Sequence, residues 1–151
     1  MSQFIDPTRE QFVDPTREQF AGFQAVPRDG VIHMLNLVRF RETAAYPDGR
    51  SASGAAAYRE YAKLSTPVFT RFGGKQFWLG RFEAMLIGPA EERWDAVFIA
   101  EYPSPDAFTA MVRDPEYRAA VVHRQAAVET SRLIRLAPKS AGAGFGESGA
   151  L

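Results

Sequence analysis

The segment from Asp95 to Tyr102, DAVFIAEY, restricts the fold of this chain more than any other. In an extended backbone the side chains alternate between two faces, so Val97 and Ile99 point one way and Phe98 points the other. Branched and aromatic apolar residues favour strands, and we predict a strand that is covered on both faces. Helices can cover one face of a sheet built from such strands, and the second face needs a cover of its own.

Three other segments predict the remaining strands. The segment VIHMLNLVRF at 31–40 is rich in branched apolar residues and predicts a buried strand. KQFWLGRFEAMLIG at 75–88 predicts two short strands around Gly80, and SRLIRL at 131–136 predicts the last strand. A loop of about a dozen residues follows the first of these segments and contains a turn at Pro47–Gly49.

Helix starts are marked by an Asp or a Ser that precedes a Pro. The side chain of the first residue accepts hydrogen bonds from free N–H groups of the first turn, and Pro fits at the next position because it needs no N–H there. Such pairs predict helices over 15–25, 104–112 and 115–128. Ser53 caps a further helix, which Pro67 kinks or splits and Gly73-Gly74 ends. One face of that helix carries Tyr58, Tyr61, Ser65, Val68 and Phe72.

The N-terminal part of the chain contains a duplication, DPTREQF at 6–12 and again at 14–20. A single helix through both copies is excluded, because Pro15 in a helix interior costs about 3 kcal/mol. The repeat is also too short for a repeat fold, whose units are about 20 to 50 residues long. We therefore assign the helix to the second copy. The first copy is interpreted as a half-turn or short helix that arose by local duplication and has no function of its own.

The predicted order is a leading helix, then strand, helix, two strands, helices and a strand. This is the βαββαβ pattern of a ferredoxin-like α+β unit with an antiparallel sheet. Residues 1–29 are predicted to form an N-terminal helical extension, residues 30–137 the ferredoxin-like domain, and residues 138–151 a flexible tail. The helices cover one face of the sheet, and a second copy of the chain related by two-fold symmetry is the economical cover for the other. We therefore predict a homodimer.

Composition excludes several functional classes. The 18 basic residues balance the 18 acidic ones and form no stripe, which argues against nucleic acid as a partner. Because cysteine is absent, disulfides, thiolate metal ligands and cysteine nucleophiles are excluded. No apolar run reaches the roughly 20 residues of a membrane helix, and the start MSQFIDPTRE lacks the features of a secretory signal. We expect a cytoplasmic protein with neither a membrane partner nor a cofactor.

The stretch WDAVFIAEYPSPDAF, with the later MVRDPEYRAAVVHRQAAVETSRLIRL, resembles domain-of-unknown-function family 1330. The second DPTREQF, HMLNLVRF and the Gly-Gly before KQFW belong to the same likeness, which covers most of residues 12–136. Its most specific feature begins with the strand that ends in Glu101 and is followed by an aromatic residue, Pro and Ser. The motif DPEY comes later, and an Arg follows it by one or two helical turns. The resemblance implies the dimeric α+β barrel. It implies no single activity, because relatives sharing this barrel include cofactor-free monooxygenases, isomerases, haem enzymes and plain ligand binders.

Glu101 and Arg124 are candidates for a functional pair. Glu101 shares a strand face with Val97 and Ile99, where a carboxylate needs a partner. Arg124 lies on a mostly apolar predicted helix, aligned with Tyr117, and can bind a carboxylate through two hydrogen bonds. Such a pair either lines a cleft that binds or deprotonates a substrate, or fixes a helix to the sheet as a structural ion pair.

The only two histidines, His33 and His123, are candidates for a general base, because imidazole titrates near neutral pH. Each can equally satisfy a backbone carbonyl and have no other role. No metal site is expected, since no ligand spacing such as H-E-x-x-H occurs. GFGESG at 144–149 formally matches a phosphate-binding loop but follows no strand and opens no helix.

Three further residues are candidates for contacts to a ligand. Asn36, which lies between two leucines in a predicted strand, needs partners for its amide and can either line a cleft or be a structural amide. Trp78 can form the wall of a pocket, and Tyr46, in the one long loop, can act as a lid. Together with Tyr117 and Arg124 they form the predicted ligand-binding set.

These residues leave three hypotheses for the function. The first is a cofactor-independent enzyme of isomerase or monooxygenase type, with an acid–base step carried by His33, Glu101 or His123. The second is a non-catalytic dimer that binds a small aromatic or carboxylated metabolite. The third is a purely structural or interaction dimer. An apolar cleft with polar ends would favour the first two over the third.

Overall fold

The computed structural model describes residues 11–142, 144 and 145, so most of the first copy of the duplication and part of the predicted tail lie outside the described residues. The helices are α1 (Arg17–Ala25), α2 (Gly54–Arg71), α3 (Pro105–Arg113) and α4 (Pro115–Ala127). The strands are β1 (Ile32–Phe40), β2 (Lys75–Gly80), β3 (Ala96–Tyr102) and β4 (Val128–Leu136).

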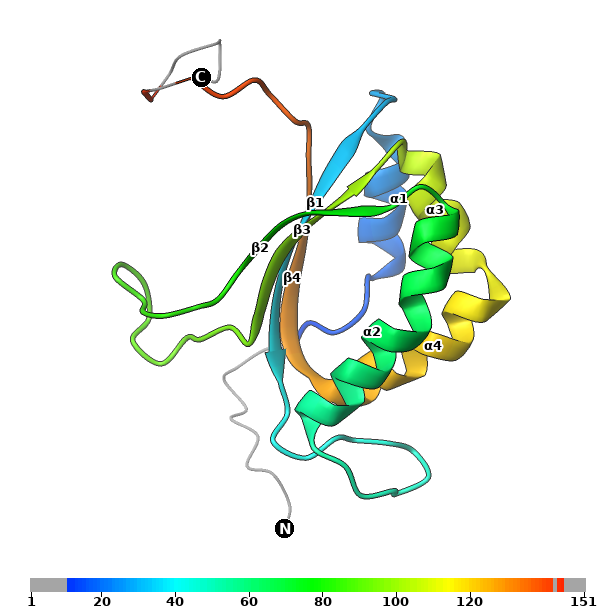
Figure 1. Ribbon diagram of the computed structural model, residues 1–151, viewed down its shortest axis with the longest axis vertical. Helices are drawn as coiled ribbons and strands as arrows, with labels where there is room; N and C mark the ends of the chain where they lie inside the picture. Colours follow the sequence, from blue (N-terminus) through cyan, green and yellow to red (C-terminus); the bar gives the residue numbers. More distant parts are fainter. Residues whose placement is uncertain (1–10, 143, 146–151) are drawn as a thin grey trace.

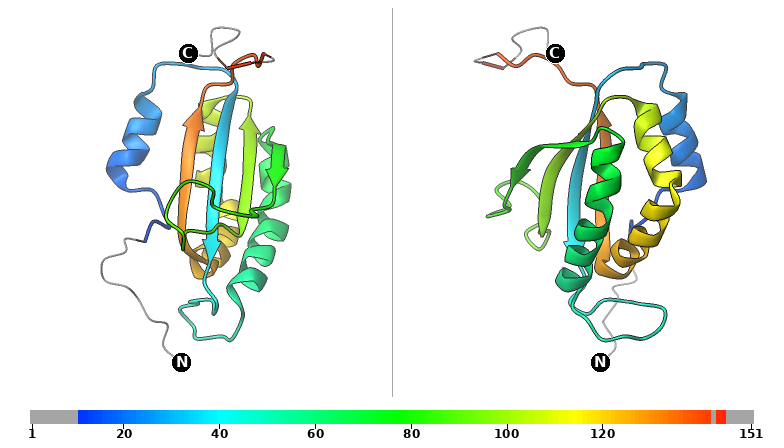
Figure 2. Two further views of the ribbon diagram at one scale, coloured as in Figure 1. Left: turned by 90° about the vertical axis from the view of Figure 1, so that its left-hand side faces the viewer. Right: turned by 45° about the vertical axis from the view of Figure 1, so that its right-hand side comes forward.

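The four strands form one antiparallel sheet with the order β2-β3-β1-β4. Helices α2, α3 and α4 lie on one side of this sheet (Figure 1), and α1 lies beside the edge strand β4 (Figure 2, left). This element order and pairing are those of a ferredoxin-like α+β fold, which confirms the predicted fold class. The helix α1 is an addition to that unit.

Alternation along the strands gives the sheet two different faces. On the face covered by helices, Ile32, Met34 and Val38 of β1 are buried. On the other face, which we name the open face, pairing aligns one apolar residue from each strand in a row: Trp78, Ile99, Leu35 and Ile134. The loop between β2 and β3 projects from the side of the open face (Figure 1).

Three of the predicted helix caps are confirmed, and one is wrong. The side-chain oxygens of Ser53, Ser104 and Asp114 accept hydrogen bonds from backbone N–H groups of the helices that follow. Helix α1 is capped by Thr16, which accepts from the N–H of Gln19 at 3.0 Å, and not by Asp14. The carboxylate of Asp14 instead accepts from Nε2 of Gln125 at 3.3 Å, so it is not available to cap the helix.

Helix α2 is continuous through Pro67, so the expected split does not occur. The helix ends where predicted. Gly73 has φ +85°, in the left-handed region that favours glycine, and the N–H of Gly74 donates to the carbonyl of Phe69 at 2.8 Å.

The prediction of two short strands within 75–88 is wrong, because only β2 is a strand there. Residues 81–95 instead form the loop from β2 to β3 and do not pair with the free edge of β2. Leu86 and Ile87 are therefore almost fully exposed. The last strand begins at Val128, three residues earlier than predicted, directly after the end of α4.

The apolar core is divided into two clusters. One contains Ile32, Met34, Val68, Ala100, Tyr102, Phe108, Met111 and Tyr117. The other contains Val38, Ala44, Ala57, Ala126, Ala127 and Val128. Along β1 the clusters are separated by Asn36, which lies between Met34 and Val38 on the same face of the sheet. A polar residue thus takes the position where the two clusters would meet.

Candidate functional site

The sheet and its helices border a cavity of about 1370 Å³ that is partly open to solvent and reaches members of both core clusters. The floor of the cavity is a row of cross-strand neighbours on the helix-covered face: Leu79, Phe98, Asn36 and Leu133. Asn36 is near the middle of this row, with apolar residues on both sides. The floor is therefore apolar apart from one amide.

Helices α2 and α4 form the roof of the cavity. Helix α2 contributes Tyr58, Tyr61, Ala62 and Ser65, and helix α4 contributes Tyr117, Val121 and Arg124. The spacings Tyr58–Tyr61–Ser65 and Tyr117–Val121–Arg124 are three or four positions, which places these residues on one face of each helix, and Ala62 borders that face beside Tyr61. The same periodicity that directs apolar residues to a core here directs three phenols and a guanidinium group into the cavity.

The polar groups of the cavity differ in how far the protein satisfies them. The hydroxyls of Tyr61 and Tyr117 share a hydrogen bond of 2.9 Å. Nδ2 of Asn36 donates to the carbonyl of Met34 at 3.0 Å, which leaves the amide oxygen as a free acceptor. Among the described residues, no hydrogen-bond partner is found for the hydroxyl of Tyr58. The cavity therefore contains a phenol donor and an amide acceptor that a bound molecule can use.

The phenols of Tyr58 and Tyr117 are neutral at physiological pH. Burial raises the pKa of Tyr58 and of Tyr117 above the ordinary value of 10.0, and the neighbouring Tyr61 raises both further. The positive charge of Arg124 acts in the opposite direction on the pKa of each, but more weakly. These phenols can donate hydrogen bonds but cannot act as general bases near neutral pH.

Arg124 reaches from α4 towards the edge strand of the sheet. Its Nη1 donates to the carbonyl of Val13 at 2.5 Å, and its Nη2 donates to Oγ of Ser131 at 3.2 Å. A guanidinium group has five N–H donors, so these two bonds leave part of its capacity unused. Within the described part of the chain, no carboxylate forms an ion pair with Arg124.

Residues 11–28, which we name the N-terminal segment, form the wall of the cavity beside β4. None of the residues of α1 is buried, although Phe20 and Phe23 pack against the first core cluster. The segment is held mainly through its backbone: Arg135 donates to the carbonyls of Phe23 and Arg28 at 2.8 Å, and the N–H of Ser131 donates to the carbonyl of Phe12 at 2.7 Å.

The predicted pair of Glu101 and Arg124 does not form. Glu101 lies on the open face, where its Oε1 is 3.0 Å from Nε2 of its cross-strand neighbour His33. Arg124 lies on the other side of the sheet, so the sheet itself separates the two groups. Each group has a hydrogen-bond partner, as expected, but strand alternation directs Glu101 to the face opposite the one that α4 and Arg124 cover.

The remaining predicted residues divide between the cavity and other places. The cavity brings together Asn36, Tyr117 and Arg124. Tyr46 and His123 contact each other, with 2.6 Å between the hydroxyl and Nδ1, but neither lines the cavity. Residues of the predicted set that lie on the open face are His33, Glu101 and Trp78.

Sequence reasoning missed Tyr58, Tyr61 and Ser131 as cavity residues. The helical spacing of Tyr58 and Tyr61 shows that they share a face, but this pattern is the same for a filled core and for a cavity wall. Ser131 gives no signal at all, because its contact with Arg124 depends on how α4 and β4 meet after the turn at Val128.

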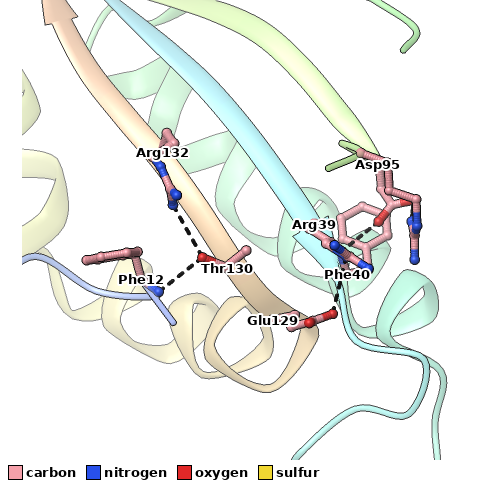
Figure 3. A network of polar contacts seen from close by, with 8 residues as sticks. Phe12, Arg39, Phe40, Asp95, Glu129, Thr130 and Arg132 are labelled. Carbon is pink, nitrogen blue, oxygen red and sulfur yellow. Dashed lines mark hydrogen bonds and ion pairs between the residues drawn. The ribbon is translucent and has the colours of Figure 1, made fainter. Parts of the chain in front are cut away.

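Pairs of polar side chains border the open face at both ends. At the end shown in Figure 3, Nε of Arg39 lies 3.4 Å from Oε2 of Glu129. Beside this pair, Oγ1 of Thr130 accepts hydrogen bonds from Nη1 of Arg132 at 3.3 Å and from the N–H of Phe12 at 3.1 Å. The guanidinium group of Arg132 also stacks 4.8 Å from the centre of the Phe12 ring.

At the other end of the open face lies the pair of His33 and Glu101, with the ring of Phe77 centred 4.3 Å from that of His33. Between these two polar ends the surface is apolar. Trp78 is 50% exposed and Ile134 is 43% exposed, although both belong to strands of the sheet. The open face thus has an apolar centre and a charged border.

No group of three or more His, Cys, Asp or Glu side chains is placed to hold a metal ion within the part of the chain that the structure describes. In the same part of the chain, none of the helices is both long enough and apolar enough to cross a membrane.

The two classes of cavity phenol should respond differently to removal of the hydroxyl. Tyr58→Phe removes a hydroxyl that has no protein partner, so we expect the free energy of unfolding to change by less than about 0.5 kcal/mol. Tyr117→Phe removes a hydrogen bond to Tyr61 and should lower the free energy of unfolding by about 1 kcal/mol. Urea denaturation monitored by circular dichroism measures both. An equal loss of stability in the two variants would show that Tyr58 is satisfied by the protein.

Comparison with solved structures shows close relatives. The chain is similar to a protein of unknown function from Rhodopseudomonas palustris, at 61% identity over 87% of this chain and 100% of that one, with a TM-score of 0.85. The methylated form of that protein matches at 63% identity over 87% of this chain and 98% of that one, with a TM-score of 0.86. A dimeric protein of unknown function with a ferredoxin-like fold from Bacteroides fragilis is more distant, at 13% identity over 71% of this chain and 95% of that one, with a TM-score of 0.45. The comparison with curated proteins finds no match.

Residues 51–135 match a family described as a domain of unknown function, DUF1330. This range is more than half of the chain and contains both roof helices of the cavity, α2 and α4. The match confirms the resemblance found in the sequence. The matched range also includes the strands and helices that form most of the cavity. On these grounds, the chain belongs to the DUF1330 family.

Proposed function

We propose that this protein binds a small, largely apolar organic molecule in the cavity between its sheet and its helices, and that it does so as a homodimer. The observation that carries the proposal is the cavity itself, with an apolar floor and unsatisfied polar groups at its wall. Its volume of about 1370 Å³ exceeds the roughly 300 to 1000 Å³ of common ligand pockets.

A purely structural role explains this interior poorly. Protein cores are close-packed, and voids much larger than a water molecule are few. A chain selected only for stability would be expected to join its two core clusters with an apolar residue at position 36. Asn36 instead interrupts them, and the unpartnered hydroxyl of Tyr58 lies across the cavity from the floor. Both features fit a ligand that supplies the missing hydrogen bonds.

The acid–base hypothesis receives no comparable support. None of its three candidate residues, His33, Glu101 and His123, lines the cavity. Burial raises the pKa values of Tyr58 and Tyr117, so these two phenols are poor bases. A catalytic step by the three candidates therefore stays a prediction, and it would require a site elsewhere on the protein. Non-catalytic binding is the function that the geometry favours.

The open face supports the homodimer. It presents the apolar row Trp78, Ile99, Leu35 and Ile134 between two charged borders, which is the arrangement of an interface with an apolar core and a polar rim. A two-fold axis through this row would place the same surface of a second copy against it and complete a barrel from the two sheets. The cavities lie on the opposite faces of the sheets, so both would stay accessible.

A thermal-shift screen with a metabolite library tests the binding proposal. A ligand present at about one hundred times its Kd should stabilise the protein by about 2.7 kcal/mol, which raises the melting temperature by several degrees. Ala62→Trp, which fills the cavity from α2, should abolish the shift. Ala110→Trp, at an exposed position of α3 outside the cavity, is the matched control and should retain it. A shift that persists in Ala62→Trp would place the ligand somewhere else.

A further inference from the structure

The charged residues that line the cavity are almost all basic. On the helix-covered side of the sheet they are Arg28, Arg124 and Arg135, against a single acidic residue, Asp14, whereas Lys75 and Arg132 extend from the open face. The chain as a whole has 18 basic and 18 acidic residues, so this wall departs strongly from the average. A wall with a uniform sign of charge and low-dielectric surroundings produces a positive potential in the cavity.

The guanidinium groups nearest to the floor are not neutralised by the protein. Arg124 donates to the carbonyl of Val13 and to the hydroxyl of Ser131, and Arg135 donates to the carbonyls of Phe23 and Arg28. All of these acceptors are neutral. Neither Arg124 nor Arg135 forms an ion pair with a described carboxylate. Buried or half-buried charges are usually paired, so these two guanidinium groups favour a negatively charged ligand over a neutral one.

Two groups with unused donor capacity, Tyr58 and Arg124, belong to the roof. The charge of Arg124 is near enough to lower the pKa of Tyr58, and both side chains line the cavity. The hydroxyl of Tyr58 has no protein partner among the described residues, and the guanidinium group has N–H groups left after its two bonds. An oxyanion accepts from both kinds of donor, and a neutral molecule of the same shape leaves the charge uncompensated.

We propose that the ligand of this cavity is an apolar organic acid whose carboxylate binds to Arg124 and Tyr58 while its hydrocarbon body lies on the floor formed by Phe98 and Leu133. This inference rests on the proposed function and adds the chemical class of the ligand and its orientation. The guanidinium group fixes the acid end beside β4. The apolar floor then directs the rest of the molecule across the sheet towards Leu79 of β2.

A pair of fluorescent probes tests the inference. Anilinonaphthalene sulfonate is an aromatic anion whose sulfonate stands in for the carboxylate, and phenylnaphthylamine is the same aromatic framework without the charge. Both become fluorescent in apolar surroundings. The wild-type protein should bind the anion at least about tenfold more tightly than the neutral probe, because only the anion compensates the charge of Arg124.

Three substitutions locate the anion. Arg124→Met should weaken binding of the sulfonate at least about tenfold more than binding of the neutral probe, whose affinity reports any loosening of the N-terminal segment that Arg124 holds. Arg118→Met removes the same charge from an exposed position of α4 that does not line the cavity, and it should change neither. Tyr58→Phe, which removes a hydroxyl with no protein partner, should weaken the sulfonate about threefold and keeps the test valid if Arg124→Met does not fold.

The outcomes separate the two proposals. If neither probe binds, or if Ala62→Trp leaves the binding of both unchanged, binding in the cavity is contradicted and the proposed function fails with it. If both probes bind with equal affinity and are displaced by Ala62→Trp, the cavity binds ligands but the inference of an acid is overturned. Equal weakening of the sulfonate by Arg124→Met and Arg118→Met would also overturn it, because the effect would then be that of net charge alone.

Discussion

Gly54→Ala is expected to lower the free energy of unfolding by about 3 kcal/mol or more. Gly54 is the first residue of α2 and is buried where the loop after β1 returns to the helix. Its N–H donates to the carbonyl of Glu42 at 3.2 Å, so the two stretches of backbone lie in direct contact. A Cβ at this position would overlap the backbone carbonyl of Arg41. Backbone cannot rotate away as a flexible side chain can, so the loop and the helix would have to separate.

Chemical denaturation of wild type and variant measures this effect, and Gly22→Ala is the matched control. Gly22 lies in α1, where a Cβ meets no atom within 4 Å. Alanine also favours a helix over glycine by about 1 kcal/mol, so the control should be as stable as wild type or slightly more stable. A Gly54→Ala protein with wild-type stability would mean that the loop after β1 does not pack on α2 as described.

Leu35→Glu is expected to convert the proposed homodimer into a monomer. Leu35 lies in the middle of the open face, with Ile99 on one neighbouring strand and Ile134 on the other. Two-fold symmetry brings both copies of the new carboxylate into the centre of the interface, where an unpaired charge costs several kcal/mol. We therefore expect the dissociation constant of the dimer to rise by about a thousandfold or more.

Light scattering coupled to gel filtration at micromolar concentration measures the mass of the particle. Val122→Glu, which places the same charge on the exposed side of α4, should remain a dimer. Circular dichroism should show that the Leu35→Glu monomer is still folded, because the side chain faces away from the core of its own subunit. A wild-type protein that is monomeric at this concentration, or a Leu35→Glu protein that stays dimeric, would contradict the proposed assembly.

The fold could be predicted from the sequence to a large extent because local signals agree with one another. Apolar alternation marks β1 and β3, capping residues before Pro mark α3 and α4, and a glycine pair marks the end of α2. The errors lie where the local signal is ambiguous. Thr16 and Asp14 are both good caps, and only the contact of Asp14 with Gln125 on α4 decides between them. In the same way, residues 81–88 have the composition of a strand but no partner strand.

The candidate site was less predictable, because it depends on which groups remain without partners. Strand and helix periodicity places Asn36 and Arg124 on their faces correctly, since both are local properties. The partner of Glu101 could not be found in this way. Its pairing with His33 follows from the register of β1 against β3, which the sequence does not encode in any short pattern. The free hydroxyl of Tyr58 is likewise a property of the packed helices and not of their sequences.

The attachment of the N-terminal segment has a consequence for how this part of the protein can change over evolution. Arg124 and Arg135 hold the segment through hydrogen bonds to the main-chain carbonyls of Val13, Phe23 and Arg28. Every amino acid has the same main-chain carbonyl. Many side chains in this segment can therefore be substituted without loss of these hydrogen bonds. A deletion of one or two residues between the carbonyls would instead shift them relative to the two arginines. Selection should therefore conserve the length of this segment more strongly than the identity of its amino acids. A duplication inserted before Val13 leaves the number of residues between the three carbonyls unchanged.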